Sequence, residues 1–194
     1  MEKVTGIILA GGKSSRMGRD KSFAEIGGRK FIEHVIAALE PVVSDIIIVA
    51  NGPGYDGLGY KVYADLLKDR GPAGGIHTGL SFSEAEKNVI VSCDTPFVSS
   101  QLLAFLLGRS GGHEITLPVH GGAPEPLCGV YRRSCLEKLE ALIRQGNLRM
   151  QELVRAFDLE EVNVEKETFY NGRLLANLNS PEEIMKYGGM NDDR

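Results

Sequence analysis

Short runs of consecutive apolar residues alternate along this chain with segments in which apolar residues recur every three or four positions. A continuous apolar run is typical of a strand buried on both faces of a parallel sheet, and the wider spacing is typical of a helix. The predicted strands are residues 4–10, 45–50, 61–64, 89–93, 115–118 and 127–131. The predicted helices are residues 31–39, 73–82, 101–107, 135–143 and 150–157.

The order strand, loop, helix repeats several times, which predicts an α/β fold with a three-layer, doubly wound and mostly parallel sheet. No internal repeat, low-complexity tract or linker divides the chain. We therefore expect one domain over residues 1–187, followed by a polar, flexible tail over residues 188–194. Sheets of this class bind ligands at the carboxyl ends of their strands. The polar segments that follow those ends are residues 11–21, Asn51, Asp65 and Asp94.

Bulk composition narrows the range of partners. The 194-residue chain carries a formal net charge of −4, which argues against a basic surface for nucleic acid. No apolar stretch approaches the roughly 18 residues of a membrane-spanning helix, and no signal peptide opens the chain. The three cysteines form no C-x-x-C pair, so we expect neither a disulfide framework nor a zinc site. A reducing cytoplasm fits this cysteine usage best.

The first loop, "LAGGKSSRMGRDK" at residues 9–21, combines glycines with several basic residues. Glycine lets backbone N–H groups approach a ligand closely, and Lys and Arg donate charge-assisted hydrogen bonds to phosphate. The segment matches neither the Walker A pattern nor G-x-G-x-x-G. It predicts a cradle for a small, strongly negative ligand such as a triphosphate, formed by Gly11, Gly12, Arg16 and Lys21.

Two later strand ends predict a metal site and a base-binding site. Asp94 follows the strand that ends at Cys93 and precedes a proline turn. A carboxylate there can hold Mg²⁺ together with the phosphate oxygens of a substrate. The alternative is a turn residue that caps the helix after Ser99. Asn51 can pair with the edge of a base through both its amide N–H groups and its carbonyl group.

Several segments together resemble one family of enzymes. The first loop resembles the signature of nucleotidyltransferases that activate small molecules with a nucleoside triphosphate. The chain also contains "VAN" at residues 49–51, Asp65 before "GPAGG" at 71–75, "CDTPF" at 93–97, "EPLCGVY" at 125–131 and "LLANLNSPEEI" at 174–184. The complete set resembles the molybdenum cofactor guanylyltransferases over nearly the whole chain. The departures from that family's pattern are Ala73, Gly74, Leu175, Ser180 and Glu183.

This resemblance implies a Mg²⁺-dependent transfer of GMP from GTP to molybdenum-loaded molybdopterin, with release of pyrophosphate. It assigns catalysis to Arg16, Lys21 and Asp94, with Asp94 as the metal ligand. The implied nucleotide-binding residues are Leu9, Ala10, Gly11, Gly12, Lys21, Asn51, Asp65, Gly71 and Asp94, with Asp69 as an alternative to Asp65. The implied acceptor-binding residues are Pro126, Gly129, Tyr131, Asn177 and Asn179. Molybdenum-insertion proteins or apo-molybdoenzymes are the macromolecular partners that the resemblance allows.

The segment "NLNSPEE" at residues 177–183 combines candidate ligand contacts with a helix start. Successive side chains alternate in an extended segment, so Asn177 and Asn179 would share a face opposite Leu178 and could read a polar heterocycle such as a pterin. A serine, a proline and two glutamates then form a good helix N-terminus. No histidine lies in a recognised motif, and an acceptor phosphate that is already ionised requires no general base.

Three other functions fit parts of the pattern. A CTP-dependent molybdopterin cytidylyltransferase would share the first loop, although the resemblance of "CDTPF" and of the C-terminal segment favours guanine. A sugar-phosphate nucleotidyltransferase would share that loop too, but such chains usually run longer. A molybdopterin carrier without catalytic activity would not need Arg16, Lys21 and Asp94 together.

Overall fold

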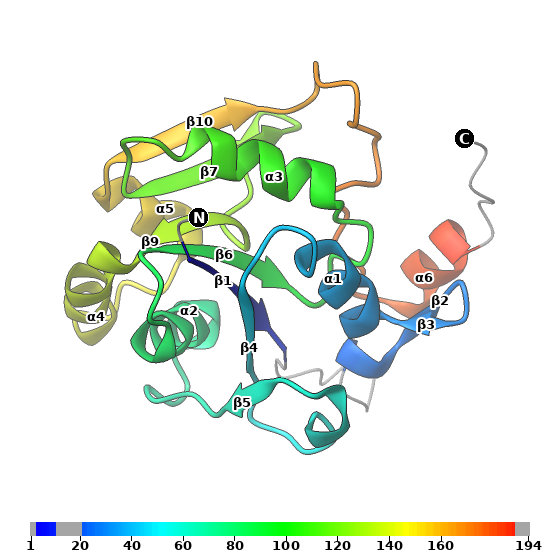
Figure 1. Ribbon diagram of the computed structural model, residues 1–194, viewed down its shortest axis with the longest axis horizontal. Helices are drawn as coiled ribbons and strands as arrows, with labels where there is room; N and C mark the ends of the chain where they lie inside the picture. The colour runs from blue at the N-terminus through cyan, green and yellow to red at the C-terminus, as the bar shows by residue number, and fades with distance from the viewer. Residues whose placement is uncertain (1–2, 11–20, 189–194) are drawn as a thin grey trace.

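An eight-stranded sheet forms the centre of the fold, which the computed structural model describes over residues 3–10 and 21–188 (Figure 1). Its strands are β1 (Val4–Leu9), β4 (Asp45–Val49), β5 (Lys61–Tyr63), β6 (Lys87–Ser92), β7 (Ile115–His120), β8 (Ala123–Pro124), β9 (Cys128–Arg132) and β10 (Leu159–Asn163). Their order is β10-β7-β9-β6-β1-β4-β5, and the short β8 pairs with β7. β1 pairs in parallel with both β4 and β6, whereas β9 runs antiparallel to β6 and β7.

Helices cover both faces of this sheet. They are α1 (Phe31–Leu39), α2 (Gly71–Phe82), α3 (Ser100–Arg109), α4 (Leu136–Arg144) and α5 (Met150–Leu153). A further helix, α6 (Pro181–Gly188), packs instead in a separate small apolar cluster. In Figure 1, α1 and α3 lie on one face of the sheet and α2 and α4 on the other. Successive residues of β1 point to these opposite layers, because Ile8 packs with α1 and α3 while Ile7 packs with α2 and α4. This arrangement confirms the predicted α/β fold. None of the helices in the described ranges combines the length and the apolar composition that crossing a bilayer requires.

The predicted elements are confirmed with their ends shifted by a residue or two, except the helix predicted over residues 150–157. That segment is α-helical only over Met150–Leu153 and continues as a 3₁₀ turn over Val154–Ala156. The pattern misses the hairpin of β2 (Glu25–Ile26) and β3 (Arg29–Lys30), together with β8 and β10. β10 lies at the edge of the sheet, and Val162 is its one fully buried residue. An edge strand with so little buried surface has no continuous apolar run to reveal it. Short 3₁₀ turns complete the described elements: η1 (Lys21–Phe23), η2 (Asp56–Leu58), η3 (Arg133–Cys135) and η4 (Val154–Ala156).

A small apolar cluster beside the main sheet fixes the C-terminal part of the chain. Phe31 and Leu178 form its buried centre, and Ile184 of α6 packs against them. Figure 1 shows α6 beside the β2–β3 hairpin. The helix begins with a capping box, in which Ser180 N–H donates to Glu183 Oε2 (2.9 Å) and Glu183 N–H donates to Ser180 Oγ (3.2 Å). The predicted helix start is therefore confirmed.

The three cysteines are reduced thiols that pack in the core. Cys93 follows β6, Cys128 lies in β9 and Cys135 lies in η3, and each is buried. Burial raises the pKa of Cys128 far above its usual range. Burial likewise raises the pKa of Cys135 to about 12, so both groups keep their protons at neutral pH.

We expect Gly79→Ala to lower the free energy of unfolding by about 1–3 kcal/mol, because its new methyl group would overlap the side chain of Ile7 under α2. Gly108→Ala is the matched control, since Gly108 also lies in a helix and a methyl group there meets no atom within 4 Å. It should stabilise the protein by up to about 1 kcal/mol through helix propensity. Urea denaturation of both variants measures the difference, and equal stabilities would contradict the described packing of α2 on β1.

We also expect the thiols to be protected in the native state. A colorimetric disulfide reagent at mildly alkaline pH should react slowly with the folded protein, because all three cysteines are buried and the pKa values of Cys128 and Cys135 are raised. In concentrated guanidinium chloride all three thiols should react at once. Rapid labelling of the folded protein at any of them would contradict their assignment to the core.

Candidate functional site

Three neighbouring strands end at one edge of the sheet. Ala10 N–H donates to the carbonyl oxygen of Val49 (2.9 Å), and Cys93 N–H donates to the carbonyl oxygen of Leu9 (3.0 Å). These backbone hydrogen bonds bring the carboxyl ends of β1, β4 and β6 to the same level. The polar residues that follow each strand are thereby gathered, as the parallel arrangement predicts. Gly11, Gly12 and Arg16 lie outside the described residues, and their roles stay predictions.

Asn51 and Asp65 form a reciprocal pair at this edge. The Asn51 side-chain amide donates to Asp65 Oδ2 (2.7 Å), and Asp65 N–H donates to Asn51 Oδ1 (2.9 Å). These two hydrogen bonds fix the orientation of the Asn51 side chain: its NH₂ group faces the Asp65 carboxylate, and its oxygen faces the Asp65 backbone N–H. Asp69, the alternative candidate, lies in the exposed turn before α2 with a left-handed backbone (φ 57°), and Gly71 opens that helix. The structure therefore pairs Asp65 with the predicted base-binding asparagine.

Asp94 occupies a tight turn directly after β6. Ser92 Oγ donates to Asp94 Oδ1 (2.6 Å), and Thr95 N–H and hydroxyl both donate to the carbonyl oxygen of Ser92. The alternative role, a cap for the following helix, is wrong. Ser99 caps α3 by accepting a hydrogen bond from Leu102 N–H (3.2 Å). Asp94 is half-buried, and the Ser92 hydroxyl restrains one oxygen of its carboxylate.

The donor set at Asp94 fits Mg²⁺ that is shared with a substrate. The described residues contain no group of three or more His, Cys, Asp or Glu side chains that could hold a metal ion by themselves. Mg²⁺ commonly takes one or two carboxylates and completes its octahedron with phosphate oxygens and water. One carboxylate fixed by a serine hydroxyl is consistent with that mode of binding.

Lys21 is presented to this edge by a buried anchor. The next residue, Ser22, is fully buried, and its hydroxyl donates to Cys93 Sγ (3.1 Å) while accepting a hydrogen bond from Tyr55 OH (3.0 Å). The η1 turn is therefore tied to the residue that precedes Asp94. The Lys21 ammonium donates to Asn179 Oδ1 (2.6 Å). The predicted phosphate-binding lysine and a predicted acceptor-binding residue are in direct contact.

The C-terminal strap, residues 177–179, crosses this edge and contacts three parts of the site. Leu178 N–H donates to the carbonyl oxygen of Asp94 (2.8 Å), and the Leu178 side chain is fully buried. The Asn177 amide donates to Glu125 Oε2 (3.4 Å), and the Asn179 amide accepts from Lys21. Both asparagines reach polar partners while the leucine enters the core, which is the division predicted from alternation.

Glu125 is a site residue that the sequence reasoning missed. Its carboxylate accepts hydrogen bonds from Leu127 N–H (3.3 Å) and from Asn177. Burial raises the pKa of Glu125, and the hydrogen bond from Leu127 N–H is the largest effect that opposes this shift. His120 and the Asn177 amide also lower the pKa, and the negative charge of Asp94 makes the smallest contribution, which raises it. A signal was present, since Glu125 opens the "EPLCGVY" segment. The Glu125 carboxylate therefore contacts one predicted acceptor residue, Asn177, and lies close enough to Asp94 for that charge to affect its pKa.

Two predicted acceptor-binding residues belong to the core of β9. Tyr131 is 1% exposed, and its hydroxyl donates to the carbonyl oxygen of Pro126 (2.7 Å). A methyl group on Gly129 would overlap Leu117 and lie 2.8 Å from the carbonyl oxygen of Thr116. Tyr131 and Gly129 thus pack against neighbouring strands and Pro126 is itself buried, and the acceptor-binding role of all three stays a prediction.

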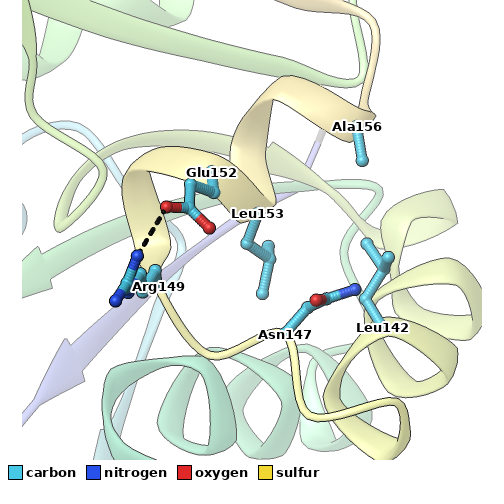
Figure 2. Close-up of a pocket in the computed structure, with 6 residues that line it drawn as sticks. All are labelled: Leu142, Asn147, Arg149, Glu152, Leu153 and Ala156. Atoms are coloured by element: carbon cyan, nitrogen blue, oxygen red, sulfur yellow. Dashed lines mark hydrogen bonds and ion pairs between the residues drawn. The ribbon is translucent and has the colours of Figure 1, made fainter.

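Two hollows in the described part of the surface are lined by other residues. A pocket of about 160 Å³ between α4 and the α5–η4 segment is lined by Leu142, Asn147, Arg149, Glu152, Leu153 and Ala156 (Figure 2). A more open one of about 320 Å³ lies beside α1 and η2 and includes Arg29, Glu40 and Tyr60. Neither includes a candidate site residue. The assignment of the site therefore rests on the cluster of polar side chains at the sheet edge.

Comparison with known proteins gives consistent matches over nearly the whole chain. Residues 6–162 match the family model described as a MobA-like NTP transferase domain. The chain is 36% identical over 185 residues to a probable molybdenum cofactor guanylyltransferase of Flavobacterium johnsoniae. That alignment covers 95% of this chain and 96% of the relative. The chain is 35% identical over 191 residues to a molybdenum cofactor guanylyltransferase of Desulfosudis oleivorans, covering 96% and 95%.

Solved structures show the same architecture. Molybdopterin-guanine dinucleotide biosynthesis protein A of Archaeoglobus fulgidus superposes with a TM-score of 0.77 at 26% identity, covering 94% of this chain and 95% of that chain. The 2-C-methyl-D-erythritol 4-phosphate cytidylyltransferase of Thermus thermophilus superposes with a TM-score of 0.72 at 17% identity, covering 97% and 98%. The second similarity concerns the fold alone. These matches confirm the family resemblance of the sequence motifs.

Proposed function

Because the chain belongs to the family of MobA-like NTP transferase domains, we propose that it transfers GMP from GTP to molybdenum-loaded molybdopterin and releases pyrophosphate. The observation that carries this proposal is the meeting of Lys21, Asp94 and Asn179 at one sheet edge. These groups come from the start, the middle and the end of the sequence. The names of the full-length relatives support guanine as the base and molybdopterin as the acceptor.

The nucleoside would bind at the ends of β1, β4 and β5. The paired Asn51 and Asp65 offer an amide and a carboxylate to the base or the ribose. The backbone of Leu9 and Ala10 lines the edge between them and Asp94. Because Asp65 holds the Asn51 amide in one orientation, the donors and acceptors that face a base are fixed before it binds.

The triphosphate would bind between Lys21 and Asp94. Three carboxylates, from Asp65, Asp94 and Glu125, lie along this edge, so an anionic ligand there needs compensating cations. Lys21 supplies one, and Arg16 and the first-loop N–H groups are the further donors that the sequence predicts. Asp94 would hold Mg²⁺, which would neutralise charge on the phosphate oxygens.

The acceptor would approach over the strap, where Asn177 and Glu125 lie. An oxygen of its terminal phosphate attacks the α-phosphorus of GTP, and the bond from that phosphorus to the bridging oxygen of pyrophosphate breaks. The attacking phosphate is ionised at neutral pH, so no side chain has to remove a proton. Lys21 stabilises the negative charge that builds on the leaving pyrophosphate.

Transfer of CMP from CTP to the same acceptor is the second candidate function. The same fold is present in a cytidylyltransferase of Thermus thermophilus, so the fold does not select the base. A molybdopterin carrier without activity is the third candidate. A carrier would need no lysine beside the Asp94 turn. Lys21 nevertheless lies there, because the buried Ser22 of η1 is hydrogen-bonded to Cys93.

We expect Lys21→Ala to weaken GTP binding by about ten- to a hundredfold, because a charge-assisted hydrogen bond to phosphate is lost. Titration calorimetry with GTP, CTP and ATP in the presence of Mg²⁺ measures this effect. Lys3→Ala, at the exposed residue just before β1, removes the same charge at the opposite edge of the sheet and should bind GTP like the parent protein. Preference of the parent for CTP would move the assignment to the cytidylyl branch, and no nucleotide binding would refute nucleotidyl transfer.

Removal of Mg²⁺ by a chelator should abolish pyrophosphate release in an assay with GTP and molybdopterin, and added Mg²⁺ should restore it. Asp94→Asn should lower turnover by about a hundredfold or more, since the carboxylate that would hold the ion is lost. Its unfolding midpoint should stay close to that of the parent, because an asparagine carbonyl can still accept the Ser92 hydroxyl. Full turnover in the chelator would exclude Mg²⁺ dependence.

A further inference from the structure

The contact between Lys21 and Asn179 assigns a role to the strap that the family resemblance does not. The Lys21 ammonium donates to Asn179 Oδ1 at 2.6 Å, across 158 positions of sequence. We propose that Asn179 is a positioning residue for the nucleotide: its amide oxygen holds the Lys21 ammonium beside the Asp94 turn before any acceptor binds. This inference rests on the proposed function and goes beyond it, because it makes Asn179 act on the nucleotide.

Both ends of the contact are fixed to the fold. On the lysine side, the buried Ser22 ties the η1 turn to Cys93 and Tyr55. On the asparagine side, the buried Leu178 side chain and its N–H bond to the Asp94 carbonyl hold the backbone. A hydrogen bond between two anchored segments restricts the lysine far more than one between two mobile loops.

The α6 capping box strengthens the asparagine end. Glu183 Oε2 accepts hydrogen bonds from the backbone N–H groups of both Asn179 and Ser180. The side chain of Asn179 is exposed, so the fold does not need it for packing. Its described side-chain contact is the one to Lys21. The amide is therefore oriented by the helix start and serves the lysine.

An ammonium group has three donors and the amide oxygen of Asn179 takes one, which leaves two for phosphate oxygens. The lysine would otherwise lose its rotamer freedom when the nucleotide binds. Holding the side chain in place beforehand moves that loss from the binding step to folding. An acidic edge that must accept a triphosphate gains most from a cation that is already positioned.

The two asparagines of the strap then have different tasks. Asn177 donates to Glu125 on the β8–β9 side, whereas Asn179 accepts from Lys21 on the η1 side. The first belongs to the acceptor half of the site and the second to the nucleotide half. This division makes the inference testable with GTP alone.

The test is a double-mutant cycle on the dissociation constant of GTP, measured by calorimetry with Mg²⁺ and without acceptor. Asn179→Ala should raise that constant about fivefold, through the less restrained lysine. In the Lys21→Ala background the same change should add nothing, because the group through which it acts is gone. Asn177→Ala provides the comparison within the strap and should leave GTP binding within about twofold, while turnover with molybdopterin falls.

Thermal unfolding of each variant reports whether the strap stays in place. Unchanged or tighter GTP binding by Asn179→Ala would overturn the inference. The inference would also fail if Asn179→Ala weakened GTP binding by the same factor in the parent protein and in the Lys21→Ala background. If the parent protein binds GTP in those cases, the proposed function stands. If the parent binds no nucleotide, the proposed function fails and the inference fails with it.

Discussion

The parallel pairing of β1 with two neighbours is the constraint on which the candidate site depends. Leu9 lies opposite Val49 of β4 and Ser92 of β6 in register. Backbone hydrogen bonds hold β4 and β6 against β1, and all three strands are buried on both faces of the sheet. None of them can shift along its neighbours without moving its buried side chains out of the core. The loops that follow these strands must therefore begin at one edge, which is why groups from distant parts of the sequence meet there.

The C-terminal strap completes that edge without joining the sheet. A single backbone bond, from Leu178 N–H to the Asp94 carbonyl, ties the end of the chain to the turn that carries the candidate metal ligand. The burial of Leu178 beside Phe31 and the capping box of α6 hold the strap from either side. One three-residue segment therefore contacts the candidate metal ligand and the predicted phosphate-binding lysine, and it contains two of the predicted acceptor residues.

The candidate site is rich in negative charge. The edge carries carboxylates at Asp65, Asp94 and Glu125, although its proposed substrates are themselves anions. All three carboxylates accept hydrogen bonds from neutral donors, which restrain them without cancelling their charge. The donors are Asn51 for Asp65, Ser92 for Asp94 and Asn177 for Glu125. Such an edge favours ligands that arrive with a divalent cation, and it makes the position of Lys21 important.

The sequence by itself determined the α/β class, the buried strands and the residues at their ends, because a doubly buried strand needs a continuous apolar run and the parallel order aligns its carboxyl end with its neighbours. It also indicated the family, since the motifs at those ends are specific. Only the tertiary structure decided which polar groups touch. β10 escaped prediction because an edge strand buries little. Tyr131 lay in a motif but faces the core, and the importance of Glu125 and of the Lys21–Asn179 contact appears only when segments far apart in sequence pack together.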